Sequence, residues 1–236
     1  MYVAELRYPG NWICVRDPDP RIPPTQEELD AIDLTTAIKG LEQPLAEAAL
    51  ALNLFEGALL NSDVSKEEFL SQPRELTQKH ERWRQGILPL AYRLAAPFLF
   101  AKSFINALWR IESLLSGIRN MPGSSDEVRS ALNEFRQKVP SLQEVRDAVA
   151  HYDERAQRKA RRAPLEPKSG GIPGVSAPDG TVLALENLHD NAFGTTDADG
   201  EYRMIQISEA TVEFARQAVQ RAIDSFEWSG FPNDVP

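Results

Sequence analysis

Three residues between Val145 and Glu154 have side chains suited to acid–base and phosphate chemistry. The stretch reads VRDAVAHYDE and includes Arg146, Asp147 and His151. A histidine transfers protons near neutral pH, so His151 can act as a general base or a general acid. An arginine offers a bidentate fork of N–H donors to phosphate oxygens, which makes Arg146 a candidate phosphate ligand.

The spacing of these residues resembles the R-x4-6-H signature of the HEPN domain family. Arg146 matches the arginine of that signature, Asp147 matches the polar residue that often follows it, and His151 matches the histidine. The resemblance covers the motif and, more loosely, the helices predicted on either side of it. It implies a helical bundle that forms a homodimer, so that two copies of the motif meet. It also implies a metal-independent RNase with no cofactor, although other members of the family are inactive binding modules.

The implied chemistry needs three groups. RNA cleavage without a metal requires a base for the 2′-hydroxyl, an acid for the leaving oxygen and a cation for the charge on the phosphorane. Arg146 suits the cation role, and the two copies of His151 in a dimer could divide the proton transfers. Five residues at about 100° each place Arg146 and His151 roughly 140° apart around an ideal helix, so a second subunit or another helix must complete the site. The alternative is structural: Arg146 pairs with a neighbouring carboxylate, and Asp147 supports His151 on a solvated helix face.

A run of cations follows the motif. Residues 155–168 carry six cations and one anion, a net charge of +5, whereas the whole chain is −9 and the remainder is therefore −14. Such a basic stripe could track an RNA backbone, or it could be a solvated helix end whose cations face the negative end of the helix dipole. The RNA-binding candidates are Arg155, Arg158, Lys159, Arg161 and Arg162.

Other classes of site are not indicated by the sequence. Cys14 is the only cysteine, which excludes an internal disulfide and a cysteine-rich zinc site. No two histidines are four residues apart, so no helical metal pair is expected. Glycine-rich nucleotide-binding loops are also missing. We expect a cytoplasmic protein with no membrane segment, because the longest apolar run, residues 87–101, is too short to span a bilayer.

The elements that must position the motif are mostly helices. Apolar residues recur every three or four positions over Leu34–Leu59, with Gly40 and Pro44 as an interruption, and again over Ile87–Ile118. Ser125 or Asp126 is suited to cap the next helix. Ser141-Leu-Gln-Glu144 matches a capping box at the start of the motif helix, which should fade near Arg162.

Strands are expected in only two regions. Val3–Tyr8 and Trp12–Val15 could form short strands in a proline-rich start. Thr181–Leu185 and Glu201–Ile207 are rich in β-forming residues and flank a polar connection carrying Asp199-Gly200, which predicts a hairpin. Ser208 should cap the last helix, and the tail from Ser229 to Pro236 should be loose.

The predicted fold is mainly α: an antiparallel helical bundle with a small β-hairpin inserted before the last helix. Residues 1–25 form an extended segment, 26–162 the bundle, 163–207 the loop and hairpin, and 208–236 the last helix and tail. Three functional hypotheses follow. The first is a HEPN-like metal-independent endoribonuclease that acts on RNA as a homodimer. The second is a non-catalytic helical module that binds a protein partner. The third is a helical enzyme of another kind, whose site has no recognisable motif in the sequence.

Overall fold

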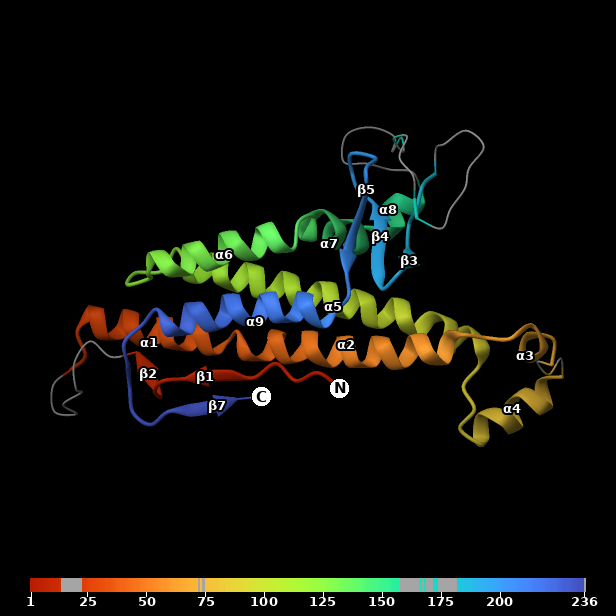
Figure 1. The fold of residues 1–236 in the computed structure, drawn as a ribbon, viewed down its shortest axis with the longest axis horizontal. Helices are drawn as coiled ribbons and strands as arrows, with labels where there is room; N and C mark the ends of the chain where they lie inside the picture. Colours follow the sequence, from red (N-terminus) through yellow and green to blue (C-terminus); the bar gives the residue numbers. More distant parts are fainter. Residues whose placement is uncertain are drawn as a thin grey trace.

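A long pair of antiparallel helices forms the frame of the protein. The computed structural model describes residues 1–13, 23–71, 73, 75–157, 166, 168, 172–173 and 182–235. In it α1 (Gln26–Lys39) and α2 (Glu42–Ser62) run end to end, and α5 (Leu90–Ile118) returns along α2 (Figure 1). The interruption expected at Gly40 and Pro44 is therefore a break between two helices. Pro44 lies in the first turn of α2, where its missing N–H costs no helical hydrogen bond.

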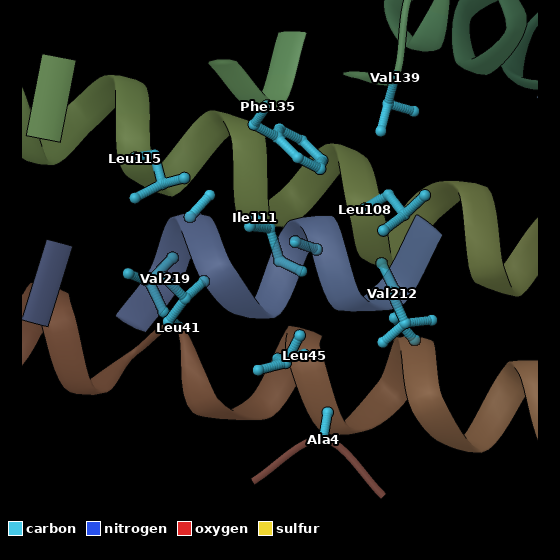
Figure 2. Packing of buried hydrophobic residues seen from close by; sticks show 14 of the residues in the cluster. Ala4, Leu41, Leu45, Leu108, Ile111, Leu115, Phe135, Val139, Val212 and Val219 are labelled. Carbon is cyan, nitrogen blue, oxygen red and sulfur yellow. The ribbon is translucent and has the colours of Figure 1, made fainter. Parts of the chain in front are cut away.

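Three further helices complete the bundle. α6 (Asp126–Lys138) and α9 (Glu209–Asp224) pack on each other and on α5, and α9 also contacts α2. α7 (Leu142–Ala150) packs on the middle of α5. Figure 2 shows side chains from these layers filling one interior, and all of those named here are at most 1% exposed: Leu41, Leu45, Leu108, Ile111, Leu115, Phe135, Val212 and Val219. The prediction of a mainly α bundle is confirmed.

The insertion before α9 is a three-stranded antiparallel sheet. Its strands are β3 (Asn187–His189), β4 (Ala192–Thr196) and β5 (Tyr202–Gln206), in the order β3-β4-β5. The second predicted strand is confirmed, whereas the first was misplaced, because residues 182–185 form no strand. The hairpin turn is Asp190-Asn191, with φ values of 46° and 59°. Both residues tolerate left-handed backbone, which matches the twist of a tight hairpin without a glycine.

The two ends of the chain pair with each other. β1 (Leu6–Tyr8) pairs antiparallel with β7 (Asn233–Val235), and β2 (Trp12–Ile13) pairs with β6 (Trp228–Ser229). The short strands expected near the start are confirmed. The prediction of a loose tail is wrong, because its backbone donors and acceptors are paired with a strand more than 200 residues away in sequence.

Side-chain amides attach the first strand to the helices. The Asn53 amide in α2 accepts from Tyr2 N–H at 2.7 Å and donates to Tyr2 C=O at 2.7 Å. The Gln220 amide in α9 does the same for Arg7, at 2.9 and 2.8 Å. Each amide therefore satisfies both backbone groups of one residue, Tyr2 before β1 and Arg7 within it, as a neighbouring strand would.

A pair of short helices projects from the far end of the frame. α3 (Lys66–Leu70) and α4 (Leu76–Arg84) connect α2 to α5 beyond the main body (Figure 1). α4 contains no buried residue. Within the described ranges, no helix combines the length and apolar character needed to cross a membrane.

Candidate functional site

The motif residues lie on and just after α7. Its apolar face, Leu142, Val145 and Ala148, is buried, and α7 contacts both α5 and strands β4 and β5 of the insertion. Ser141 enters the helix with φ 64° and its side chain makes no capping hydrogen bond. The predicted capping box is therefore wrong, because a capping serine needs extended backbone to direct its hydroxyl to the N–H groups of the first turn.

Arg146 and Asp147 belong to a closed network of four side chains. Trp109 Nε1 donates to Gln143 Oε1 at 3.1 Å, and the Gln143 amide donates to Asp147 Oδ1 at 3.0 Å. Arg146 Nη1 donates to the same Asp147 oxygen at 3.2 Å. The guanidinium carbon lies 4.0 Å from the centre of the Trp109 ring, which closes the network by a cation–π contact. The network fixes the direction of the arginine and links α7 to α5.

A shallow groove runs between α5 and α7 on the Arg146 side. Its volume is about 310 Å³. Polar groups from α5 meet Arg146 there, and its lining consists of Leu99, Lys102, Ser103, Ile105, Asn106, Arg146, Val149 and Ala150. Lys102 Nζ lies 2.5 Å from Glu186 Oε1, so an ion pair ties α5 to the residue before β3. The groove thus combines two cations, each balanced by one carboxylate.

His151 stands at a break in the helix. α7 ends at Ala150, His151 has φ −109° and ψ 34°, and a short helix, α8 (Tyr152–Ala156), follows. The single helix expected from Ser141 to Arg162 is therefore wrong over its described part. The imidazole is 44% exposed, and its Nδ1 lies 3.5 Å from Glu154 Oε1. Because of the break, the ideal-helix angle between Arg146 and His151 no longer applies, although no described contact joins their side chains.

Only part of the basic stripe lies within the described residues. Arg155 was expected on an exposed helix face, but it is 5% exposed. Its Nε and Nη1 atoms are buried and have no hydrogen-bond partner among the described residues. Burial withdraws this guanidinium from a surface that could bind a phosphate backbone. Arg158, Lys159, Arg161 and Arg162 lie outside the described residues.

A larger groove lies on the opposite edge of the bundle, over β1, β7 and α9. It measures about 840 Å³ and contains a cluster of Tyr2, Glu213 and Arg216. Hydrogen bonding from Arg216, at 2.7 and 2.8 Å, with further bonds from Gln217 and Tyr2, lowers the pKa of Glu213 to about 2. Burial, followed by its hydrogen bond to Glu213, raises the pKa of Tyr2 to about 12. Because Glu213 and Arg216 neutralise each other and Glu213 also binds Tyr2, the cluster fastens the segment before β1 to α9.

Sequence reasoning missed Trp109, Gln143 and Lys102. The i, i+4 spacing of Gln143 and Asp147 is a recognisable signal for a hydrogen-bonded pair. Trp109 and Lys102 could not be found from spacing, because packing decides which side of α5 faces α7. Among the described residues, no group of three metal-ligating side chains lies together.

Comparison with known proteins adds no relative to this description. No protein-family model matches the chain, and neither the curated proteins nor the solved structures gave a match to it.

Proposed function

We propose that this chain is a HEPN-like helical protein that cleaves RNA without a metal, at a site completed by two copies. The observation that carries the proposal is the position of Arg146 in the α5–α7 groove, together with Lys102. His151 follows the groove residue Ala150 directly and is exposed. A groove lined by Arg146 and Lys102, followed in sequence by an exposed histidine, offers phosphate-binding groups and a proton-transfer group.

Arg146 is suited to the role of phosphate ligand because it is oriented but not saturated. Asp147 accepts one hydrogen bond from Nη1, and Trp109 covers one face of the guanidinium. The described residues accept no further hydrogen bond from Nε or Nη2. Those donors would bind the non-bridging oxygens of the phosphorane, while Asp147 and Trp109 act as positioning residues.

The proposed reaction is an internal transesterification. One His151 removes the proton of the 2′-hydroxyl, and the 2′-oxygen forms a bond to phosphorus as the bond to the 5′-oxygen breaks. A second, protonated His151 gives its proton to the departing 5′-oxygen. The products are a 2′,3′-cyclic phosphate and a 5′-hydroxyl, and the two histidines have exchanged protonation states. The reaction uses two histidines and one copy of the chain supplies a single His151, so a second copy has to supply the other.

The second candidate is a non-catalytic interaction module. The observation that favours it is the closed network around Trp109. An Arg146 that served only to hold α7 on α5 would make the same contacts. The two candidates differ in whether His151 affects a chemical rate.

The test is cleavage of a defined single-stranded RNA in the presence of a chelator, with His151→Ala compared against His189→Ala. His189 is a close match for His151: it is 43% exposed, and its Nε2 lies 3.1 Å from Asp190. Proton transfer by a placed histidine contributes about 10²–10⁴-fold in rate, so we expect His151→Ala to lose at least about a hundredfold. His189→Ala should cleave like the parent.

A correctly folded His151→Ala variant that cleaves as fast as the parent would contradict the proposal, and the interaction module would be the remaining candidate. Equal losses in both histidine variants would do the same. The basic stretch that follows α8 is proposed to hold the RNA strand. Charge reversal of Arg158 and Arg161 should therefore weaken binding in a salt-dependent way while largely sparing cleavage of bound RNA.

A further inference from the structure

Apolar side chains are exposed in one region far more than elsewhere. Ten of the twenty large apolar residues that are exposed among the described residues lie between Leu60 and Leu99, about a sixth of the chain. We call residues 60–99 the distal arm; it comprises the end of α2, α3, α4 and the start of α5 (Figure 1). The ten are Leu60, Phe69, Leu70, Leu76, Trp83, Ile87, Leu88, Tyr92, Leu94 and Leu99.

The helix α4 in this arm lacks packing within one copy. It has nine residues, none of them buried, and it exposes Leu76 by 63% and Trp83 by 42%. Isolated helices shorter than about 12–15 residues are marginal in water, and most helical stability comes from packing an apolar face. A surface outside the single copy is the natural source of that packing.

The exposed area is the size of an interface. The exposed fractions of the ten side chains, 41–83%, correspond to an area on the order of 1,000 Å². Each partner in a standard interface buries about 800 Å². Summed over its ten residues, the exposed area of the arm is therefore about as large as the area that one partner buries.

The charges of the arm are self-complementary. Residues 60–70 carry three carboxylates and one cation, a net charge of −2, whereas residues 79–84 carry three cations and one carboxylate, a net charge of +2. Within the described ranges, Asp63 and Glu67 on the acidic side form no ion pair, and neither do Arg82 and Arg84 on the basic side. A two-fold axis would place the basic α4 of each copy against the acidic α2–α3 end of the other, because a two-fold interface uses the same patch twice.

We propose that the distal arm is the docking surface for a second copy of this chain. Apolar contacts from α3, α4 and the start of α5 form the centre of the interface, and the acidic and basic ends pair across it. Leu99 belongs to the arm and also lines the α5–α7 groove, so the interface reaches the edge of that groove. The inference rests on the second copy that the proposed function requires and names the surface that binds it, but it does not itself require RNA cleavage.

The experiment is sedimentation equilibrium of the full chain without RNA, with folding of each variant checked by circular dichroism. We expect the parent to self-associate with a Kd below about 10 µM, and Leu76→Ser/Leu88→Ser to weaken association at least tenfold. Phe231→Ser is the matched control, because Phe231 is 83% exposed and lies outside the arm; it should associate like the parent.

Charge exchange tests the identity of the partner. Arg82→Glu/Arg84→Glu and Asp63→Lys/Glu67→Lys should each weaken association at least tenfold, and an equimolar mixture of the two variants should recover the parent affinity within about threefold. A parent that stays monomeric up to about 200 µM would overturn the inference. Binding of that monomer to lipid vesicles would not rescue it, because the arm would then have a different partner. Arm variants that associate like the parent, or a mixture no tighter than its components, would also overturn the inference. A parent that associates but does not cleave RNA would contradict the proposed function alone, whereas a monomeric parent would contradict both proposals.

Discussion

Arg146 shows how much one side chain depends on its neighbours. A planar guanidinium can stack on an indole and bind a carboxylate at the same time, and Arg146 does both, with Trp109 and Asp147. The two contacts use few of the N–H donors of the guanidinium, but they restrict the rotation of the side chain. The same geometry would serve a structural cation and a phosphate ligand, so a measurement of rate has to separate them.

Replacing Arg146 by alanine should affect rate much more than stability. Losing charge stabilisation of a phosphorane should slow cleavage about a hundredfold, whereas losing a half-exposed cation–π contact should cost about 1 kcal/mol of unfolding free energy. Single-turnover cleavage and urea unfolding measure the two quantities. Arg110→Ala is the control, because Arg110 is also on the surface of the bundle and is ion-paired with Glu47; an equal loss of rate in both variants would contradict the prediction.

Glu213 should control part of the acid sensitivity of folding. Its pKa in the folded chain is about 2, against an ordinary value of 4.5, because Arg216 stabilises the charged form. A lowered pKa contributes stability that is present above the ordinary value and is lost as pH falls toward the folded value. The side chain is about a third exposed, so we expect a contribution of about 1–2 kcal/mol. Urea unfolding at about pH 6 and about pH 2.5 should show a smaller acid loss in Glu213→Gln. Glu209→Gln, an exposed carboxylate on the same helix, should behave like the parent.

At the scale of elements, the sequence predicted those whose signals are local. Ser125 and Ser208 cap α6 and α9 as expected, because serine followed by an acidic, apolar-periodic run is a local signal. The break at His151 was missed, since VRDAVAHYDERA has no proline or glycine and continues in helical period. There, contacts made by α7 with α5 and the insertion override local propensity. The cap at Ser141 failed for a related reason, because the path from α6 into α7 requires left-handed backbone.

Two glycine substitutions should change stability in opposite directions. Gly57 lies inside α2 with no atom near the position of an added Cβ, so Gly57→Ala should stabilise by about 1 kcal/mol through helix propensity. Gly194 in β4 lies beneath Tyr202, whose hydroxyl would be 2.0 Å from an added Cβ. Gly194→Ala should therefore displace the tyrosine and destabilise the insertion by about 1–3 kcal/mol. Thermal unfolding compares both with the parent, and a shift of the same sign in both would contradict the packing described here.

At the scale of the whole molecule, the pairing of the chain ends was not predictable. Neither strand has a strong local pattern, and the partner of each lies more than 200 residues away. The tail also contains glycine and two prolines, which are typical of unpaired ends. Tertiary contacts decide the outcome: Trp228 meets Tyr8 edge to face at 5.3 Å and donates from Nε1 to Ile223 C=O at 2.8 Å.

Removing the tail should therefore unfold more than the tail. Truncation after Glu227 exposes Tyr8 and Leu6, which are now 1% and 3% exposed, and it leaves β1 and β2 without partners. We expect a loss of at least about 3 kcal/mol of unfolding free energy, measured by urea titration. Phe231→Ala within the same tail, where the side chain is 83% exposed, should leave stability unchanged. A truncated chain as stable as the parent would show that the end strands contribute nothing to the fold.

The direction of this pairing also determines how the protein resists force. Leu6 lies opposite Val235, so the start of β1 and the end of β7 are at the same side of the ladder (Figure 1). A load applied between the two chain ends would meet one hydrogen-bonded pair at a time and open the ladder like a zipper. Parallel strands loaded in shear would instead share the load among several bonds. The end strands should thus detach at low force in a single-molecule pulling experiment and leave the helical frame folded until a second, higher-force event.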